Sequence, residues 1–182
     1  MTQQLALPLA VLDSSVLVPR WARVSLQCLA ARQDPLYAPV WSEWIIAETW
    51  RVLTQQWLTR APNPDQFDEA TLRRAANGML HYLLPVMRLV SLRAYTGSGP
   101  WPDLTDEDDA PIWQTAVVAG AQYVVSNNIG DFPPLVQGRH VYAGIEYLTA
   151  IEFIEDILGE DAEQIYGAPL PAGAAVRSRR GR

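Results

Sequence analysis

A carboxylate directly follows a short apolar run near the start of the chain. Residues 5–12, LALPLAVL, are all apolar, and Asp13 comes next. Such a run is typical of a buried strand in a parallel sheet, and the ligand crevice of such a sheet lies just beyond the carboxyl ends of its strands. Asp13 is therefore a candidate catalytic residue. The alternative is that Asp13, Ser14 or Ser15 only caps the following helix, because these residue types accept hydrogen bonds from free backbone N–H groups.

A second carboxylate interrupts an apolar stripe. Trp41, Ile45, Glu48 and Val52 follow one another at helical spacings, so we expect them to share one face of a helix. A carboxylate on a core-facing stripe is costly unless it is paired or binds a metal ion. Glu48 is therefore a second candidate, and a salt bridge to Arg51, three residues further on, is the alternative.

Four acidic residues in a row, at positions 106–109, crowd the first turn of another predicted helix. The helix dipole favours each of them by roughly 0.3–1 kcal/mol. Because adjacent carboxylates repel one another, the run of four also favours a bound cation. Asp109 precedes the apolar positions Ile112, Trp113 and Ala116, so it is the member that we expect to point into the crevice.

Strands and helices alternate along the chain, which favours an α/β fold with a parallel sheet. Turn formers, above all prolines and glycines, separate the elements. The strand over residues 123–125 ends at Ser126, Asn127 and Asn128, and Asp131 lies in the next turn. The other predicted helices cover residues 16–32, 42–58, 66–84, 105–118 and a segment from 149, and the other strands cover residues 36–38, 87–92, and either 141–142 or 145–147.

Length and composition suit one globular domain. The chain has 182 residues and a net charge of −6, and all its basic residues are arginine. Four arginines lie in the last six positions, so residues 1–176 carry 10 positive against 20 negative charges, or −10. An acidic body argues against sequence-blind attraction to a polyanion, although a divalent ion held by carboxylates would reverse the charge locally. Without lysine, the chain has neither a phosphate-binding GxxxxGK[ST] loop nor a Schiff-base site.

Few residues of this chain suit soft metals or disulfides. His81 and His140 are far apart, with no cysteine nearby, which argues against zinc. The single cysteine, Cys28, lies in the apolar run VSLQCLAA and is predicted to be a buried structural thiol. No export signal and no apolar run of about 18 residues is present, so we expect a cytoplasmic protein without a membrane segment.

Three of these segments together resemble the PIN-domain nucleases. The segment VLDSSVLVP looks like the first strand and leading Asp of that family, and WSEWIIAETWRVL looks like its Glu-bearing helix. The segment DEDDAPIWQTAVVAGAQYVVSNNIGDFP looks like its third acidic position with the strand and turn that close the site. The likeness covers about residues 9–158 and is closest to bacterial PIN proteins regarded as toxin components. It implies a three-layer α/β/α fold with a central, mainly parallel sheet.

The resemblance also assigns the site residues. It places the acidic constellation at Asp13, Glu48 and Asp109, with Asn128 or Asp131 in the fourth position. Asp13 and Asp109 are the expected main ligands of Mg²⁺ or Mn²⁺, and Glu48, with Asn128 or Asp131, is expected to act directly or through water. Hard oxygen ligands suit these ions, which retain several waters and can activate one for phosphodiester hydrolysis.

This chain departs from the family pattern at three positions. Asn128 is an amide where many relatives have Asp, which weakens that ligand unless Asp131 reaches the site. Pro111 and Ser15 stand where close relatives tend to have a His and an Asn, so the departures affect substrate positioning more than metal binding.

The implied function is metal-dependent endonucleolytic cleavage of single-stranded RNA by the toxin of a toxin–antitoxin pair. Expected partners are single-stranded RNA, a small antitoxin protein and a second copy in a homodimer. The first alternative is a PIN-like RNA-binding or protein-interaction module that no longer cuts. The second is a metal-dependent phosphatase of another doubly wound family, which the Ser15 position disfavours.

We expect a nuclease domain over residues 1–160 with a helical insertion at about 60–85, followed by a flexible, basic tail over 161–182 that either solubilises the chain or touches RNA.

Overall fold

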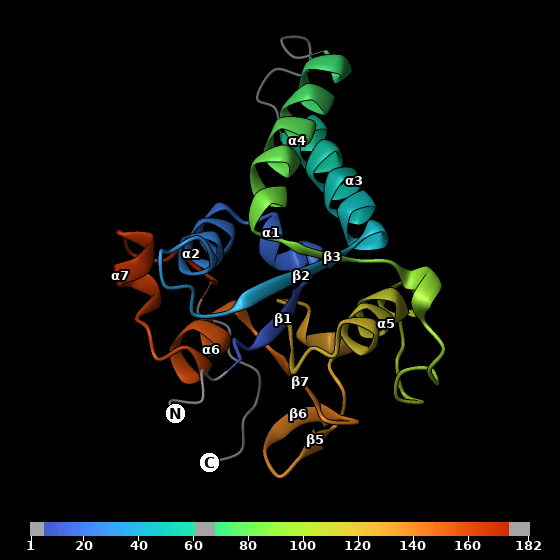
Figure 1. Cartoon of the computed structure of the whole chain (residues 1–182). Helices are drawn as coiled ribbons and strands as arrows, with labels where there is room; N and C mark the ends of the chain where they lie inside the picture. Colours follow the sequence, from blue (N-terminus) through green and yellow to red (C-terminus); the bar gives the residue numbers. More distant parts are fainter. Residues whose placement is uncertain (1–5, 61–67, 175–182) are drawn as a thin grey trace.

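A seven-stranded sheet runs through the middle of the molecule (Figure 1). The computed structural model describes residues 6–60 and 68–174. The strand order is β3-β2-β1-β4-β7-β6-β5. The first five strands in this order pair in parallel, whereas β6 pairs with β7 and β5 with β6 in antiparallel fashion. The strands are β1 (Leu9–Leu12), β2 (Ala38–Ser42), β3 (Arg88–Val90), β4 (Tyr123–Val125), β5 (Leu135–Val136), β6 (Arg139–Tyr142) and β7 (Ile145–Leu148).

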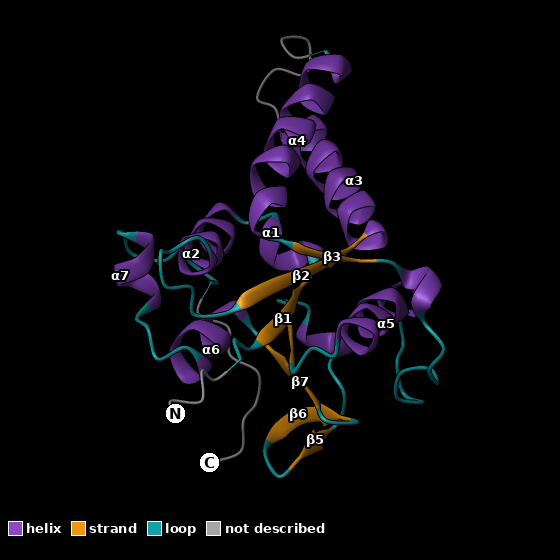
Figure 2. Cartoon of the chain, in the orientation of Figure 1, coloured by secondary structure: helices purple, strands orange, loops and turns teal. Residues whose placement is uncertain are grey.

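Helices cover both faces of the sheet, which confirms the predicted three-layer α/β/α architecture (Figure 2). α5 lies on one face, and α2 and α6 lie on the other (Figure 1). None of the helices in residues 6–60 and 68–174 has both the length and the apolar character of a membrane span. The helices are α1 (Ser14–Leu17), α2 (Arg20–Ala30), α3 (Glu43–Arg60), α4 (Glu69–Leu83), α5 (Ala110–Ala119), α6 (Ala150–Glu152) and α7 (Ala162–Tyr166).

The pair α3 and α4 projects beyond the sheet (Figure 1). The indole N–H of Trp50 on α3 donates to the Asn77 side chain on α4 at 3.0 Å, and the Arg73 guanidinium lies 5.8 Å from the centre of the Trp50 ring. The proline-rich break predicted after α3 falls largely at residues 61–67, outside the described part of the chain, as does the end of the tail at 175–182.

Several local predictions need correction. The helix predicted over residues 16–32 is interrupted at Pro19, which separates α1 from α2. Trp41 is the fourth residue of β2 rather than part of the next helix, so it does not share a helix face with Glu48. Cys28 is exposed, not buried, because α2 turns Trp21, Ala22, Ser25, Leu26 and Leu29 toward the core and leaves Cys28 on the opposite side. The two alternatives for the last strand are both present, as the hairpin of β6 and β7.

The helix after β7 begins with a buried capping box. The Thr149 hydroxyl accepts from the Glu152 N–H at 3.3 Å, and the Glu152 carboxylate accepts from both the Thr149 N–H at 2.9 Å and its hydroxyl at 2.8 Å. Both residues are buried. A buried carboxylate depends on such donors, so the box anchors the start of α6 beside the carboxyl end of the sheet.

We expect Thr149→Ala to lower the free energy of unfolding by about 1–2 kcal/mol, because it removes the helix cap and one donor to a buried carboxylate. For a chain of this length the melting temperature falls by about 3–6 °C, measurable by thermal or denaturant unfolding. Thr149→Ser keeps the hydroxyl and is the matched control. Equal losses in the two variants would contradict a role for the hydroxyl.

Candidate active site

Asp13 is held at the carboxyl end of β1 by its neighbours on β4. The parallel register pairs Leu12 with Val125, and the Asp13 N–H donates to the Val125 carbonyl at 3.0 Å. This register brings Ser126 beside Asp13. Oδ2 of Asp13 accepts from the Ser126 hydroxyl at 2.9 Å and from the Ser15 hydroxyl and N–H at 2.6 and 3.3 Å.

These hydrogen bonds leave the second carboxylate oxygen of Asp13 available. All three donors converge on Oδ2, and none of the described residues donates to Oδ1. Asp13 does accept from the backbone of α1, as the capping alternative requires, but it also lines a cleft. The residue is 5% exposed, so its orientation is set by buried contacts. Asp13 can therefore cap α1 with one oxygen and offer the other to a ligand.

Asp109 ends the 3-10 turn that leads into α5 and lines the same cleft. Its side chain caps no backbone N–H of that helix. Partial burial, and then the negative charges of Asp13 and Asp131, raise the pKa of Asp109 to about 7. A hydrogen bond with Asp131 acts in the same direction. Near neutral pH the Asp109 carboxyl is thus close to half protonated, and a cation beside it would restore the carboxylate.

The two candidates for the fourth position occupy different places. The Asn128 amide donates to Oδ2 of Asp131, and the Thr105 hydroxyl donates to Oδ1 of Asp131 at 3.1 Å. Asn128 lines the cleft itself. Asp131 lines a small hollow next to the cleft, together with Asn128 and Asp109, and interacts with Asp109. Both side chains therefore lie at the site, with Asp131 interacting with Asp109 and Asn128 holding Asp131.

Glu48 lines the cleft from α3, but it is already paired. The Arg51 guanidinium forms a two-pronged salt bridge with it, with contacts of 2.8 Å and 2.6 Å to the two carboxylate oxygens. This hydrogen-bonded charge pair raises the pKa of Arg51. The salt bridge to Arg51, which is the alternative predicted for Glu48, is thus present. Glu48 can contact a metal ion only if Arg51 moves away or a water molecule bridges Glu48 and the ion.

The cleft is strongly acidic. It has a volume of about 430 Å³, and it is lined by five carboxylates and one guanidinium, those of Asp13, Glu48, Asp106, Asp108, Asp109 and Arg51. Within the described ranges, however, no three residues of the types Asp, Glu, His and Cys lie in a grouping that would hold a metal ion. The donor set therefore fits an ion that needs only one or two protein carboxylates and completes its shell with water and phosphate oxygens, as Mg²⁺ does.

Two residues of the site escaped the sequence reasoning. The sequence predicts Ser126 only as the end of a strand, yet its hydroxyl orients Asp13. The signal that marks it is the parallel register of β1 and β4, which brings Ser126 beside Asp13. Tyr147 on β7 is buried near Asp109, and none of the described residues pairs with its hydroxyl. Burial, and then the charges of Asp109 and Asp13, raise its pKa. No local pattern marks Tyr147, because its neighbours on β7 are all buried as well.

Comparison with known proteins agrees with this geometry. The family model of the PIN domain matches residues 10–130, about two thirds of the chain, and includes Asp13, Glu48 and Asp109. No curated protein sequence matches the chain. PIN domains are generally nucleases and typically use Mg²⁺ or Mn²⁺. With the three-layer fold and the match over most of its length, this chain belongs to the PIN-domain family, which has a nuclease-type fold.

Proposed function

We propose that the chain is a metal-dependent endoribonuclease that hydrolyses phosphodiester bonds in single-stranded RNA. The observation that carries this proposal is the juxtaposition of Asp13 and Asp109, from segments almost a hundred residues apart, in one cleft. None of the described basic residues forms a salt bridge with either of them. Two neighbouring carboxylates without a cationic partner form an expensive arrangement in the absence of a bound cation.

Mg²⁺ or Mn²⁺ would be held by Oδ1 of Asp13 and by the Asp109 carboxylate. When bound, the ion would supply an activated water and neutralise charge on the phosphate and on the departing 3′ oxygen. Ser126 and Ser15 keep Asp13 in place through Oδ2. Asp131 increases the negative charge at Asp109. Among the described residues that line the cleft, Arg51 is the one cation, so its guanidinium can contact an RNA phosphate.

The proposal is tested by incubating labelled single-stranded RNA with the purified chain and Mn²⁺ or Mg²⁺. We expect internal cleavage that EDTA abolishes, with much slower cleavage of duplex RNA and of single-stranded DNA. If several unrelated single-stranded RNAs remain intact with both ions, the chain is not a general endoribonuclease.

A second candidate function is RNA binding without cleavage. Two observations favour it: Arg51 is hydrogen-bonded to both carboxylate oxygens of Glu48, and the cleft itself is lined by the amide of Asn128, whereas Asp131 lies in the hollow beside it. The two functions differ in one readout, because a binding module retains intact RNA in the presence of Mn²⁺ whereas a nuclease releases shorter fragments.

The role of Ser126 gives a prediction that does not depend on RNA. We expect Ser126→Ala to weaken Mn²⁺ binding by roughly tenfold, because a residue that orients a metal ligand typically contributes 10- to 100-fold to affinity. Titration of Mn²⁺ followed by electron paramagnetic resonance measures this effect. Ser25→Ala is the matched control, since Ser25 is also buried but lies on α2 without a hydrogen-bond partner for its hydroxyl in the described part of the chain. Unchanged affinity in Ser126→Ala would contradict a role of this hydrogen bond in metal binding by Asp13.

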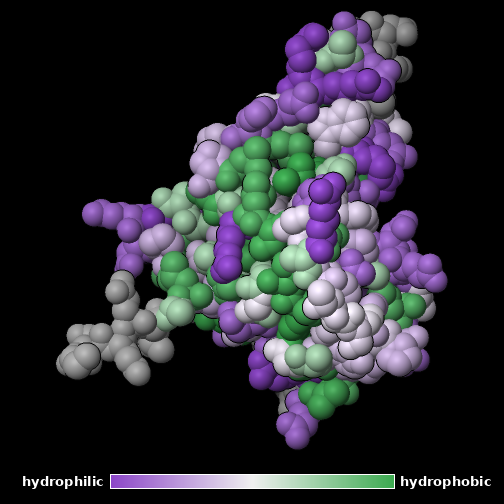
Figure 3. All heavy atoms as spheres, turned by 45° about the vertical axis from the view of Figure 1, so that its right-hand side comes forward, coloured by the Kyte–Doolittle hydropathy of each residue, from purple (hydrophilic) through white to green (hydrophobic). Residues whose placement is uncertain are grey.

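We also propose that the chain acts in the cytoplasm as the toxin of a pair with a small antitoxin protein, and that it forms a homodimer. Apolar side chains gather below the projecting α3–α4 pair (Figure 3). Among the exposed large hydrophobic residues are Leu89 on the edge strand β3 and Val117 on α5. An exposed apolar surface of this kind suits a protein interface. The molar mass in solution, from light scattering, tests the dimer, and co-purification with the product of an adjacent gene tests the antitoxin.

A further inference from the structure

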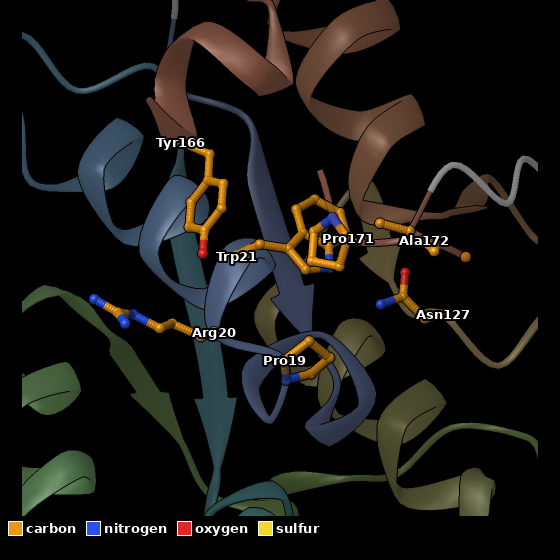
Figure 4. A pocket seen from close by; sticks show the side chains of 9 residues that line it. Pro19, Arg20, Trp21, Asn127, Tyr166, Pro171 and Ala172 are labelled. Atoms are coloured by element: carbon orange, nitrogen blue, oxygen red, sulfur yellow. The ribbon is translucent and has the colours of Figure 1, made fainter. Parts of the chain in front are cut away.

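A hollow of about 420 Å³ opens beside the catalytic cleft. The rings of Tyr166 on α7 and of Pro171 in the segment that follows α7 line it, together with Arg20 and Asn127 (Figure 4). Trp21 on α2 also lines it, although this residue packs into the core and is 5% exposed. Aromatic and proline rings with a few polar groups at the edge form the type of surface on which a planar base stacks.

Asn127 joins this hollow to the catalytic cleft, because it lines both. Its position is well determined: its N–H donates to the Ser15 hydroxyl at 2.8 Å, and its side-chain amide donates to the Ser15 carbonyl at 3.3 Å. A groove also runs from Ser14 and Ser15, which border the cleft, to Arg20, which borders the hollow. The backbone of a nucleic-acid strand bound in the cleft can follow this groove to Arg20.

The charge at the edge of the hollow is positive and unbalanced. Arg20 forms no hydrogen bond or salt bridge with any described residue, and its guanidinium points away from Asn127 (Figure 4). Arg23 has no carboxylate partner among the described residues and donates instead to the carbonyls of Leu17 and Val18. Burial, and then the charge of Arg20, lower its pKa. By contrast, Arg32, Arg51, Arg73 and Arg139 are each paired with a glutamate.

The start of α2 adds to this positive charge. Pro19 is the N-cap residue, and its side chain cannot cap the first N–H groups of the helix. Free N–H groups and the positive end of the helix dipole favour an anion. The unpaired Arg20, the neighbouring Arg23 and this helix end together form a site for one phosphate group at the edge of a base-sized hollow.

We propose that the hollow bordered by Trp21, Tyr166 and Pro171 holds a base of the RNA strand next to the cut, while Arg20 contacts the phosphate of that nucleotide. This inference rests on the proposed function, because it needs a single strand in the catalytic cleft. It assigns a nucleotide subsite outside the acidic cleft and explains how an acidic chain retains RNA, since one arginine-bearing edge and a stacking surface supply the attraction.

The first test measures binding rather than cleavage. In an Asp13→Asn background, which keeps RNA intact, fluorescence anisotropy gives the affinity for a short single-stranded RNA in Mn²⁺ at several salt concentrations. We expect Arg20→Gln to weaken binding about tenfold and to reduce the slope of log affinity against log salt by about one. Arg88→Gln is the matched control, because Arg88 is exposed on the edge strand β3. Equal affinities in the two variants would overturn the phosphate contact.

The second test uses RNAs that lack one base at successive positions. We expect one abasic position to weaken binding about tenfold, and we expect Tyr166→Leu to remove that dependence while keeping the apolar packing of α7. If no position matters, or if Tyr166→Leu leaves the dependence unchanged, the base subsite does not exist. Cleavage by the wild-type chain is measured separately, so the subsite can fail while the nuclease proposal stands, and the nuclease proposal can fail while RNA binding stands. DNA of the same sequence shows whether the subsite requires ribose.

Discussion

Asp13→Asn is expected to lower the rate of metal-dependent RNA cleavage by about 10³-fold. Loss of the charged ligand removes several kcal/mol of transition-state charge stabilisation, and each 1.36 kcal/mol corresponds to a factor of ten. The asparagine oxygen can still accept from Ser126 and Ser15, so the fold is retained. Initial rates on a labelled single-stranded RNA at saturating Mn²⁺ measure the loss, and thermal unfolding confirms that the variant is folded.

Asp34→Asn is the matched control for this experiment. Asp34 is exposed in the loop that precedes β2, so it lies toward the opposite end of the sheet from Asp13. We expect its cleavage rate to equal that of the wild type. If Asp13→Asn cuts as fast as Asp34→Asn, the observed activity belongs to another site or to a contaminant, and the nuclease assignment of this cleft is wrong.

Asp109→Asn should make the metal-free chain more stable at pH 8, although it removes a proposed metal ligand. The pKa of Asp109 is raised from its ordinary 3.8 to about 7, so the folded state binds more protons than the unfolded state between these values. The free energy of unfolding of the wild type therefore falls as the pH rises from about 4 through 7. The neutral amide removes that penalty, and we expect a gain of about 1–2 kcal/mol at pH 8, a figure reduced for solvent screening at a half-exposed group.

The measurement is denaturant unfolding of both chains in EDTA between pH 5 and 8, followed by thermal unfolding with added Mn²⁺. We expect the difference between the two chains to shrink toward pH 5, and Mn²⁺ to raise the melting temperature of the wild type but not of Asp109→Asn. Asp103→Asn, at an exposed position shortly before the acidic run and not among the residues that line the cleft, is the matched control. A wild type whose stability rises with pH over this range would contradict the charge repulsion at Asp109.

These two effects together describe a trade-off between stability and function at one cleft. Asp13 and Asp109 repel each other in the free protein, and under the proposed function the same repulsion would favour a bound cation. Arg51 forms a salt bridge with Glu48 on α3 but with neither Asp13 nor Asp109, so it does not compensate the negative charges of these two aspartates.

Local sequence was sufficient for the main features of the site. The apolar run before Asp13 and the apolar positions after Asp109 each determine an element on their own, and parallel strands bring their carboxyl ends to one edge. Asp13 follows β1 and Asp109 precedes α5, whose first turn lies at the same edge because α5 leads back to the start of β4, so this placement predicts that the two residues lie near each other. The metal and RNA roles of both residues remain proposals that the experiments above test.

Other features depended on contacts that no local pattern encodes. The helix period could not show that Pro19 separates two helices, because proline also suits the first turn of a continuous helix. Similarly, helical spacing made both a metal and Arg51 plausible partners of Glu48, and only the three-dimensional arrangement of side chains decided for Arg51.

The sequence by itself determined the alternation of strands and helices, the position of Asp13 after a strand and of Asp109 before a helix, and the absence of lysine chemistry, since each of these is a property of a short segment or of composition. The tertiary structure alone decided that Ser126 orients Asp13, that Asp131 reaches Asp109, and that rings from α2 and α7 form a hollow beside the cleft. The physical reason is distance along the chain: these contacts join segments that meet only when the sheet assembles, and their register is set by the packing of the whole core.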